Sequence, residues 1–149
     1  MTGRGAGLTV MVLGAVVAVL PAFTWYAVPV AGGAVRASGF AGAGQLLLLP
    51  VAGAAAVLAG AALVSSRRDA RAATARRTGL VTVAAGLVAL GFTVWAAADP
   101  RVTLTADLPG GTEVVPATVD VEPAAYIAPV VCALLVVMGV AVAWSGRRR

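Results

Sequence analysis

Four stretches of about twenty apolar residues divide this chain of 149 residues. They cover residues 7–26, 45–64, 79–98 and 124–144, and none of them contains an acidic or basic residue. The hydrocarbon core of a bilayer is about 30 Å thick, and a helix needs about 20 apolar residues to cross it. The pattern therefore predicts an all-α integral membrane protein, built as a bundle of four transmembrane helices.

The segments between the stretches differ in pattern. Residues 27–44 hold two short extended runs around a Gly-Gly pair, which is typical of a β-hairpin. Residues 99–123 alternate apolar and polar positions at 102–105 and again at 114–121, with a Pro-Gly-Gly turn between these runs. Because an isolated hairpin is marginal in water, we expect the two hairpins to pack together as one small extracytoplasmic β element.

Charge alternates with the apolar stretches. Nine of the eleven arginines and one acid lie at the two termini and in the loop 65–78, which gives that side a net charge of +8. The loops 27–44 and 99–123 carry two arginines and five acids, a net charge of −3. Arginines that flank spans retain loops in the cytoplasm, so we expect a multi-pass protein of the plasma membrane with both termini cytoplasmic. Arg4 is expected to hold the N-terminus on the cytoplasmic side. Eight further arginines are expected to set the topology and to contact lipid headgroups: Arg67, Arg68, Arg71, Arg76, Arg77, Arg147, Arg148 and Arg149.

Composition agrees with a membrane class. The chain is 60% hydrophobic and 11% charged, with a mean hydropathy of +0.97, whereas soluble domains are about 45–50% apolar and about 25% charged. The four stretches use more than half of the chain, so we expect one membrane domain over residues 1–149. We expect the first stretch to be retained, because it exceeds the about 7–15 apolar residues of a signal peptide. The net charge of +5 comes from loops that flank the spans and does not indicate a nucleic-acid partner.

The chain offers little chemistry. It has no histidine, and its one cysteine, Cys132, lies inside an apolar stretch. Ionisable residues within spans usually mark proton and ion pathways, so their absence argues against a proton-coupled transporter. Asp120 and Glu122 have the spacing of two carboxylates on one face of a strand, which suits a general acid–base pair or a metal bound by oxygen ligands. Solvated hairpin charges explain the same acids, and we expect no enzyme activity, cofactor or metal.

Aromatic residues gather near the outer ends of the stretches, whereas Trp144 alone marks the inner boundary. They indicate either packing beneath the outer strands or recognition of a ligand or partner. Together with the outer acids they form the candidate recognition set Trp25, Tyr26, Phe40, Trp95, Asp107, Glu113, Asp120 and Glu122. Small residues recur at helical spacing in pairs such as Gly53 with Gly60 and Gly79 with Gly86. Such pairs allow close helix contacts, either within the bundle or between copies of the chain.

Local sequence also carries a resemblance. The first stretch ends in Leu20-Pro21-Ala22-Phe23-Thr24-Trp25, and the second opens with Gln45-Leu46-Leu47-Leu48-Leu49-Pro50. With the intervening Arg36-Ala37-Ser38-Gly39-Phe40-Ala41, these segments resemble the actinobacterial tryptophan-operon-associated transmembrane proteins. The resemblance implies a small four-helix membrane protein, from a family without an assigned biochemical role and without catalytic residues to carry over.

These observations predict a non-enzymatic membrane protein that acts as an accessory or scaffold subunit. Its expected partners are the lipid bilayer and either another membrane protein or further copies of the same chain. The alternative is a binding or transport component for a small apolar or aromatic molecule, which the outer aromatic residues motivate. A link of that molecule to tryptophan or indole is implied by the resemblance alone.

Overall fold

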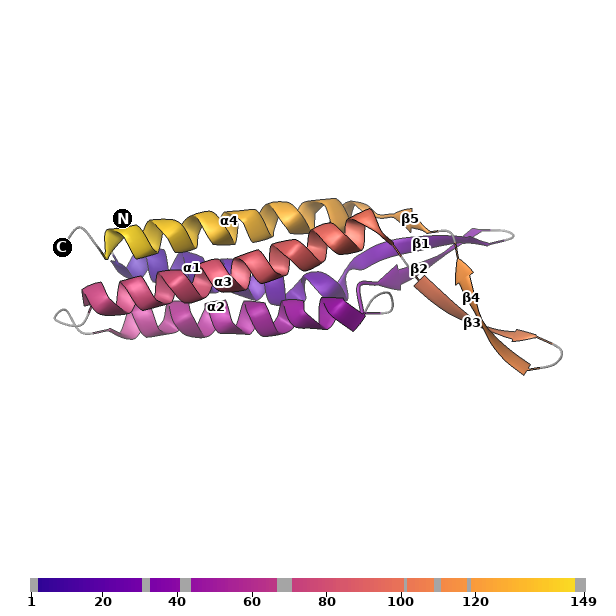
Figure 1. The fold of residues 1–149 in the computed structure, drawn as a ribbon, viewed down its shortest axis with the longest axis horizontal. Helices are drawn as coiled ribbons and strands as arrows, with labels where there is room; N and C mark the ends of the chain where they lie inside the picture. Colours follow the sequence, from indigo (N-terminus) through magenta and orange to yellow (C-terminus); the bar gives the residue numbers. More distant parts are fainter. Residues whose placement is uncertain are drawn as a thin grey trace.

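The computed structural model describes residues 3–30, 33–40, 44–66, 71–100, 102–108, 111–117 and 119–146. Its elements in chain order are α1 (Gly3–Val19), the 3-10 helix η1 (Leu20–Ala22), β1 (Thr24–Val30), β2 (Gly33–Ser38), the 3-10 helix η2 (Gly44–Leu47), α2 (Leu48–Ser65), α3 (Arg71–Ala98), β3 (Val102–Leu108), β4 (Gly111–Ala117), β5 (Asp120–Val121) and α4 (Pro123–Ser145). The four α-helices lie side by side, and β1, β2 and β5 lie at one end of the bundle (Figure 1). The first residues of α1 and the last residues of α4 lie at the opposite end.

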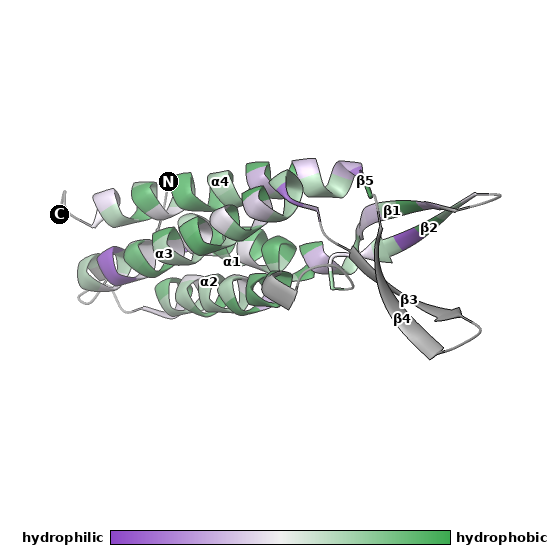
Figure 2. Cartoon of the chain, turned by 45° about the vertical axis from the view of Figure 1, so that its right-hand side comes forward, coloured by the Kyte–Doolittle hydropathy of each residue, from purple (hydrophilic) through white to green (hydrophobic). Residues whose placement is uncertain are grey.

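All four helices are long and apolar enough to cross a membrane, by length and composition. Apolar residues lie around most of the circumference of each helix and are not confined to one stripe (Figure 2). Packing inside the bundle instead follows small and buried residues. In α4 the buried positions are Ala125, Ala128, Cys132, Leu135, Gly139 and Val142. Their alternating spacing of three and four residues is the 3.5-residue period of left-handed, coiled-coil-like packing.

Two helix bounds differ from the predicted spans. Helix α1 ends at Val19 and is followed by η1, which contains Pro21. Proline has no N–H to continue the helical ladder, and Phe23 is already extended, with φ −76° and ψ 165°. The end of the predicted span 7–26 is therefore strand rather than helix. At the other end of the bundle, α3 begins at Arg71, so the later part of the predicted loop 65–78 is helical.

Glycines let α1 approach α2 closely, and they let α3 approach α4 closely. Helix α1 packs on α2, where a methyl group added to Gly53 would lie 2.5 Å from the carbonyl oxygen of Gly14 and 2.6 Å from the nitrogen of Ala18. Helix α3 packs on α4, where a methyl group on Gly139 would lie 3.0 Å from the carbonyl oxygen of Gly79. The small residues singled out in the sequence thus serve contacts within the chain, between helices that the topology joins as antiparallel neighbours.

The strands form two sheets. The first has the order β2-β1-β5, and the second consists of β3 and β4. Both predicted hairpins are present, and the first sheet takes strands from both loops, because β5 follows the second hairpin. The two hairpins themselves lie in separate sheets. Only β5, two residues long, joins the first hairpin, where Ala27 pairs with Asp120 and Tyr26 with Val121. Pro116 in β4 provides a physical reason, because proline cannot donate to a further strand at a sheet edge.

Candidate functional site

Two aromatic residues at the start of β1 connect the three-stranded sheet to the bundle. Trp25 and Tyr26 are 0% and 1% exposed, and their ring centroids lie 6.5 Å apart. The indole Nε1 of Trp25 donates a hydrogen bond to the carbonyl oxygen of Leu20 at 2.8 Å. The hydroxyl of Tyr26 donates to the carbonyl oxygen of Ala96, near the end of α3, at 3.5 Å. Both predicted recognition residues are therefore buried and hydrogen-bonded within the chain.

The local sequence explains how this junction packs. Gly39, just after β2, lies against the rim of Trp25, and a methyl group there would be 3.1 Å from both Trp25 Cδ1 and the Pro21 backbone. The N–H of Gly39 donates to the carbonyl oxygen of Phe23 at 3.3 Å. Burial raises the pKa of Tyr26, because desolvation disfavours the phenolate. The hydroxyl therefore stays protonated well above neutral pH and remains a donor to Ala96.

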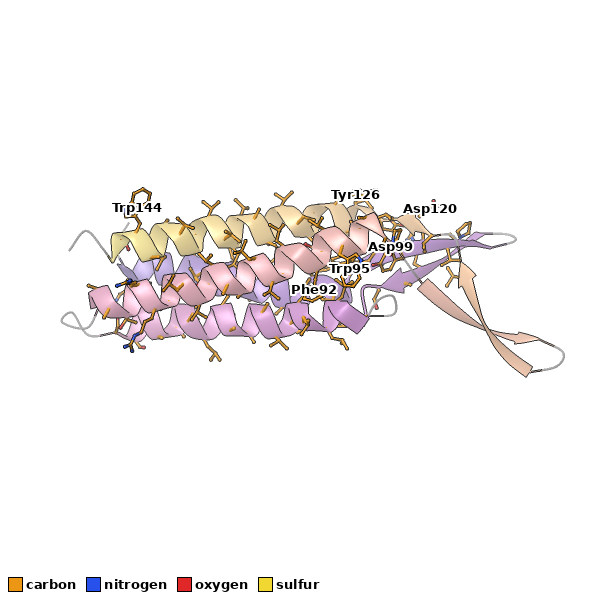
Figure 3. The ribbon with its side chains drawn as sticks, in the orientation of Figure 1. Phe92, Trp95, Asp99, Asp120, Tyr126 and Trp144 are labelled. Carbon is orange, nitrogen blue, oxygen red and sulfur yellow. The ribbon has the colours of Figure 1, made fainter. Side chains whose placement is uncertain are left out.

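Other members of the predicted set lie in exposed positions. Phe40 and Trp95 are 43% and 48% exposed, and Trp95 stacks against Phe92 with 6.4 Å between ring centroids (Figure 3). Asp120 is exposed on β5. On the second sheet, Asp107 stands opposite Thr112 and Glu113 opposite Ala106 in the backbone register. The side chains of Asp107 and Glu113 lie outside the described parts of the structure.

An ion pair that the sequence did not predict joins β2 to the residue that follows β5. The guanidinium Nε of Arg36 on β2 lies 3.8 Å from Oε1 of Glu122. The backbone N–H of Glu122 also donates to the carbonyl oxygen of Trp25 at 2.9 Å. Since the Arg36 side chain is 75% exposed, the pair contributes at most about 1 kcal/mol. One signal was available in advance, because Arg36 and Arg101 are the only bases among the outer acids.

The arginines predicted at the inner end are described in part. Arg4, Arg76 and Arg77 are exposed, and Arg71 is the first residue of α3. All three described side chains lie within the first turns of α1 or α3, at the end of the bundle opposite β1 and β2. The remaining members of the predicted set, Arg67, Arg68, Arg147, Arg148 and Arg149, lie outside the described residues.

Polar groups inside the bundle are threonines that bond to helix backbone. Thr78, Thr82 and Thr93 are buried. The hydroxyl of Thr78 donates to the carbonyl oxygen of Ala59 on α2 at 3.1 Å, which ties α3 to α2. Thr82 and Thr93 donate to carbonyl oxygens of their own helix at 2.8 and 3.0 Å. Among the described residues, no group of three or more His, Cys, Asp or Glu residues could hold a metal ion.

The predicted recognition residues are thus divided by the fold. Trp25 and Tyr26 form a buried junction, Phe40, Trp95 and Asp120 are exposed, and Glu122 pairs with Arg36. What the structure does assemble is a cap, the sheet of β1, β2 and β5, which Trp25 and Tyr26 fasten to the bundle. Comparison with known proteins adds no relative: no family model, no curated protein and no solved structure matches the chain, so the resemblance noted in the sequence stays a prediction.

Proposed function

We propose that the chain is a non-enzymatic protein of the plasma membrane, with both termini in the cytoplasm, that acts as an accessory or scaffold subunit through its outer cap. The observation that carries the proposal is the attachment of the cap. A small sheet is held to four apolar helices by two buried aromatic residues with hydrogen-bonded polar atoms. A sheet anchored in this way presents a defined surface outside the membrane, which is what a subunit needs to bind a partner.

The spacing of exposed aromatic residues supports a position in the bilayer. Tyr126 and Trp144 lie 18 residues apart on α4, and both are more than half exposed. Eighteen residues make five helical turns and rise about 27 Å, so both rings lie on the same side of the helix. This distance matches a hydrocarbon core of about 30 Å. Tyrosine and tryptophan favour the two membrane–water interfaces, and Figure 3 shows the two rings at opposite ends of α4.

Helix α3 repeats this spacing with a different pair of residues. Arg77 and Trp95 are also 18 residues apart, and both are exposed. An arginine can extend its guanidinium to the headgroups from the inner boundary. The first six residues of α3, Arg71–Arg76, then project beyond the hydrocarbon core on the inner side. The two helices therefore support the same depth in the bilayer. With the proposed orientation, β1 and β2 are on the outer side of the membrane.

The orientation makes a direct prediction for cysteine labelling. In a Cys132→Ser background, a cysteine introduced at Thr112 should react with a membrane-impermeant maleimide added to intact cells. A cysteine introduced at Ala72 should react only after the cells are permeabilised. Labelling with the opposite pattern would contradict the proposed topology, and labelling at both positions in intact cells would contradict a single orientation.

The partner proposal is tested by affinity capture with matched variants. Val35 is exposed on β2, and Ala73 is exposed in the first turn of α3 at the other end of the bundle. Val35→Glu places a charge on the cap, while Ala73→Glu places the same charge away from it. We expect one protein to co-purify with the wild-type chain and with Ala73→Glu in mild detergent, and to be lost with Val35→Glu. Repeated capture without any partner, whether another polypeptide or a second, differently tagged copy of the chain, would contradict a subunit that acts through its cap. Equal capture by all three would contradict it as well.

The alternative function is binding of a small apolar molecule, and the fold leaves fewer aromatic residues available to contact such a ligand. Trp25 and Tyr26 are buried and bonded to their own chain, so they are not free to contact a ligand. The stacked pair Phe92 and Trp95 remains, with Trp95 half exposed. These rings lie at the depth where aromatic residues anchor helices at an interface, and this anchoring accounts for them without a ligand.

A further inference from the structure

The strand β2 lies at the edge of its sheet. The register and the hydrogen bonds show which of its N–H and C=O groups point away from β1 on this open edge. The N–H of Glu122 donates to the carbonyl oxygen of Trp25, so the backbone of Trp25 faces β5. The register shifts next to Trp25, but beyond the shift Pro29 has no N–H to exchange with Ala34, so that pair is not hydrogen-bonded. Backbone direction alternates along an antiparallel ladder, and Ala27 therefore turns away from β2 as Pro29 does. Their partners in the register are Arg36 and Ala34. Residues in such a pair turn their N–H and C=O groups away from each other, so Ala34 and Arg36 present theirs on the open edge of β2.

The strand β3 has an open edge of the same kind. Its residue Thr103 pairs with Pro116 of β4. Pro116 has no N–H to exchange with Thr103, which makes this a non-hydrogen-bonded pair in which both backbones turn outward. By alternation, Thr105 and Asp107 also present their backbone groups on the open edge of β3.

Prolines protect the neighbouring edges but not these two. Pro29 lies on the side of β1 that β5 leaves uncovered, and Pro116 lies on the open side of β4. A proline at an edge prevents the addition of a further strand. Neither β2 nor β3 contains a proline or a lysine. An unprotected edge is a template for another strand. β5 also lies at an edge without a proline but is two residues long, so among the described strands of six or seven residues β2 and β3 are the two that carry such an edge.

Direction and charge show that the two edges complement each other. β2 leads back toward α2, whereas β3 leads away from α3. Copies of the chain that share one membrane orientation would therefore bring β2 of one copy and β3 of the next together as antiparallel strands. Two copies of β2 would instead meet as parallel strands, which is the less stable pairing. Arg36 is the only charged residue of β2, and Asp107 is the only charged residue of β3. Arg36 also pairs with Glu122 of its own chain, but its side chain is 75% exposed and can contact a second carboxylate.

We propose that β3 of one copy adds to the edge of β2 of the next copy, so that the chain assembles head to tail through its outer strands. The contact is heterologous, because two different edges meet, and it generates a ring or a row of copies in the membrane. Main-chain hydrogen bonds supply the affinity, as in other cases of strand addition. This inference rests on the proposed function, since it requires copies with a common membrane orientation, and it names the scaffold's partner as the chain itself.

Two proline variants test the assembly. Ala34→Pro removes an outward N–H from β2, and Thr105→Pro removes one from β3, without removing a hydrogen bond of either hairpin. The control Ala34→Ser keeps the N–H. The measurement is the mass distribution of purified full-length protein reconstituted into lipid nanodiscs large enough for several copies. We expect oligomers from the wild type and from Ala34→Ser, and association weakened at least about tenfold in each proline variant, because lost hydrogen bonds and a steric block act together.

Mixing the two proline variants shows whether the contact joins different edges. Ala34→Pro retains an intact β3, and Thr105→Pro retains an intact β2, so an equimolar mixture should form dimers and no larger species. Dimers in the mixture also show that both variants fold. A wild type that stays monomeric, a proline variant that assembles like the wild type, or a mixture that stays monomeric would each overturn the inference. The labelling experiment at Thr112 and Ala72 is independent, so a failure of the proposed topology is distinguished from a failure of the assembly.

Discussion

Replacement of Gly79 by alanine is expected to destabilise the bundle by about 1–3 kcal/mol, the cost of overpacking a tight contact. A methyl group at this position would lie 2.6 Å from both Cα and Cβ of Ala143 on α4. These atoms belong to the backbone or are attached directly to it, so no side-chain rotation can relieve the contact. The helices α3 and α4 would have to move apart along their length. The measurement is reversible unfolding of the purified protein in mixed micelles with increasing SDS, followed by tryptophan fluorescence.

Gly91 provides a matched control on the same helix. A methyl group on Gly91 has no heavy atom within 4 Å, and the residue is exposed. Alanine is favoured over glycine in a helix by about 1 kcal/mol, so Gly91→Ala should leave stability unchanged or raise it. A Gly79→Ala variant that unfolds at the same SDS fraction as the wild type would contradict the close contact between α3 and α4. An equal loss of stability in Gly79→Ala and Gly91→Ala would show that the effect comes from helix α3 itself rather than from its contact with α4.

Replacement of Trp25 by alanine is expected to cost about 3–5 kcal/mol, the usual range for deleting a buried aromatic side chain. Trp25 is the largest fully buried side chain, and it fills the junction between the sheet and the bundle. Its loss would leave a cavity at that junction and would release the hydrogen bond to Leu20. We expect the cap to detach while the helices persist. Far-UV circular dichroism should keep most of its helical signal, and a cysteine introduced at Val121 should become more reactive toward maleimide.

Two further tryptophan variants separate the effect of the Trp25 hydrogen bond from the effect of its volume, and both from the general effect of removing an aromatic residue. Trp25→Phe keeps much of the ring but lacks the N–H, so it should lose about 1 kcal/mol for the hydrogen bond and a further part for the smaller volume. Trp95→Ala removes an aromatic residue that is half exposed and should change stability in micelles by no more than about 0.5 kcal/mol. If Trp95→Ala were as damaging as Trp25→Ala, the assignment of the junction to Trp25 would be wrong.

The positions of the helices could be predicted because apolar length is a local property of the sequence. Helix α4 covers Pro123–Ser145 against the predicted 124–144. The bounds differ where backbone chemistry overrides hydropathy. Pro21 ends the first helix early, although the residues after it are apolar enough to continue a span. The basic start of α3 is polar in sequence but helical in the structure, because its alanines and arginines favour a helix whether or not the segment is apolar.

The candidate site was harder to predict, and Trp25 shows why. Near a membrane boundary an aromatic residue can anchor the helix in the headgroups, bind a partner or pack beneath other structure, and the sequence pattern is the same in each case. The run Trp25–Val28 is buried on both faces of β1, so it lacks the apolar–polar alternation that would have marked one side as exposed. The pairing of Arg36 with Glu122 depends on β5 joining β1, and no local pattern encodes a contact across 86 residues of sequence.

The sequence by itself determined the four apolar helices, the charge difference between the two ends and the two β-hairpins, because length, charge and turn residues act locally. It also contained the glycines along the helix contacts. Only the tertiary structure decided which helix each glycine meets and which aromatic residues are buried. It also decided that the two hairpins form separate sheets with β2 and β3 as open edges. These outcomes depend on packing and on hydrogen bonds between distant segments, and such contacts form only when the helices bring those segments together.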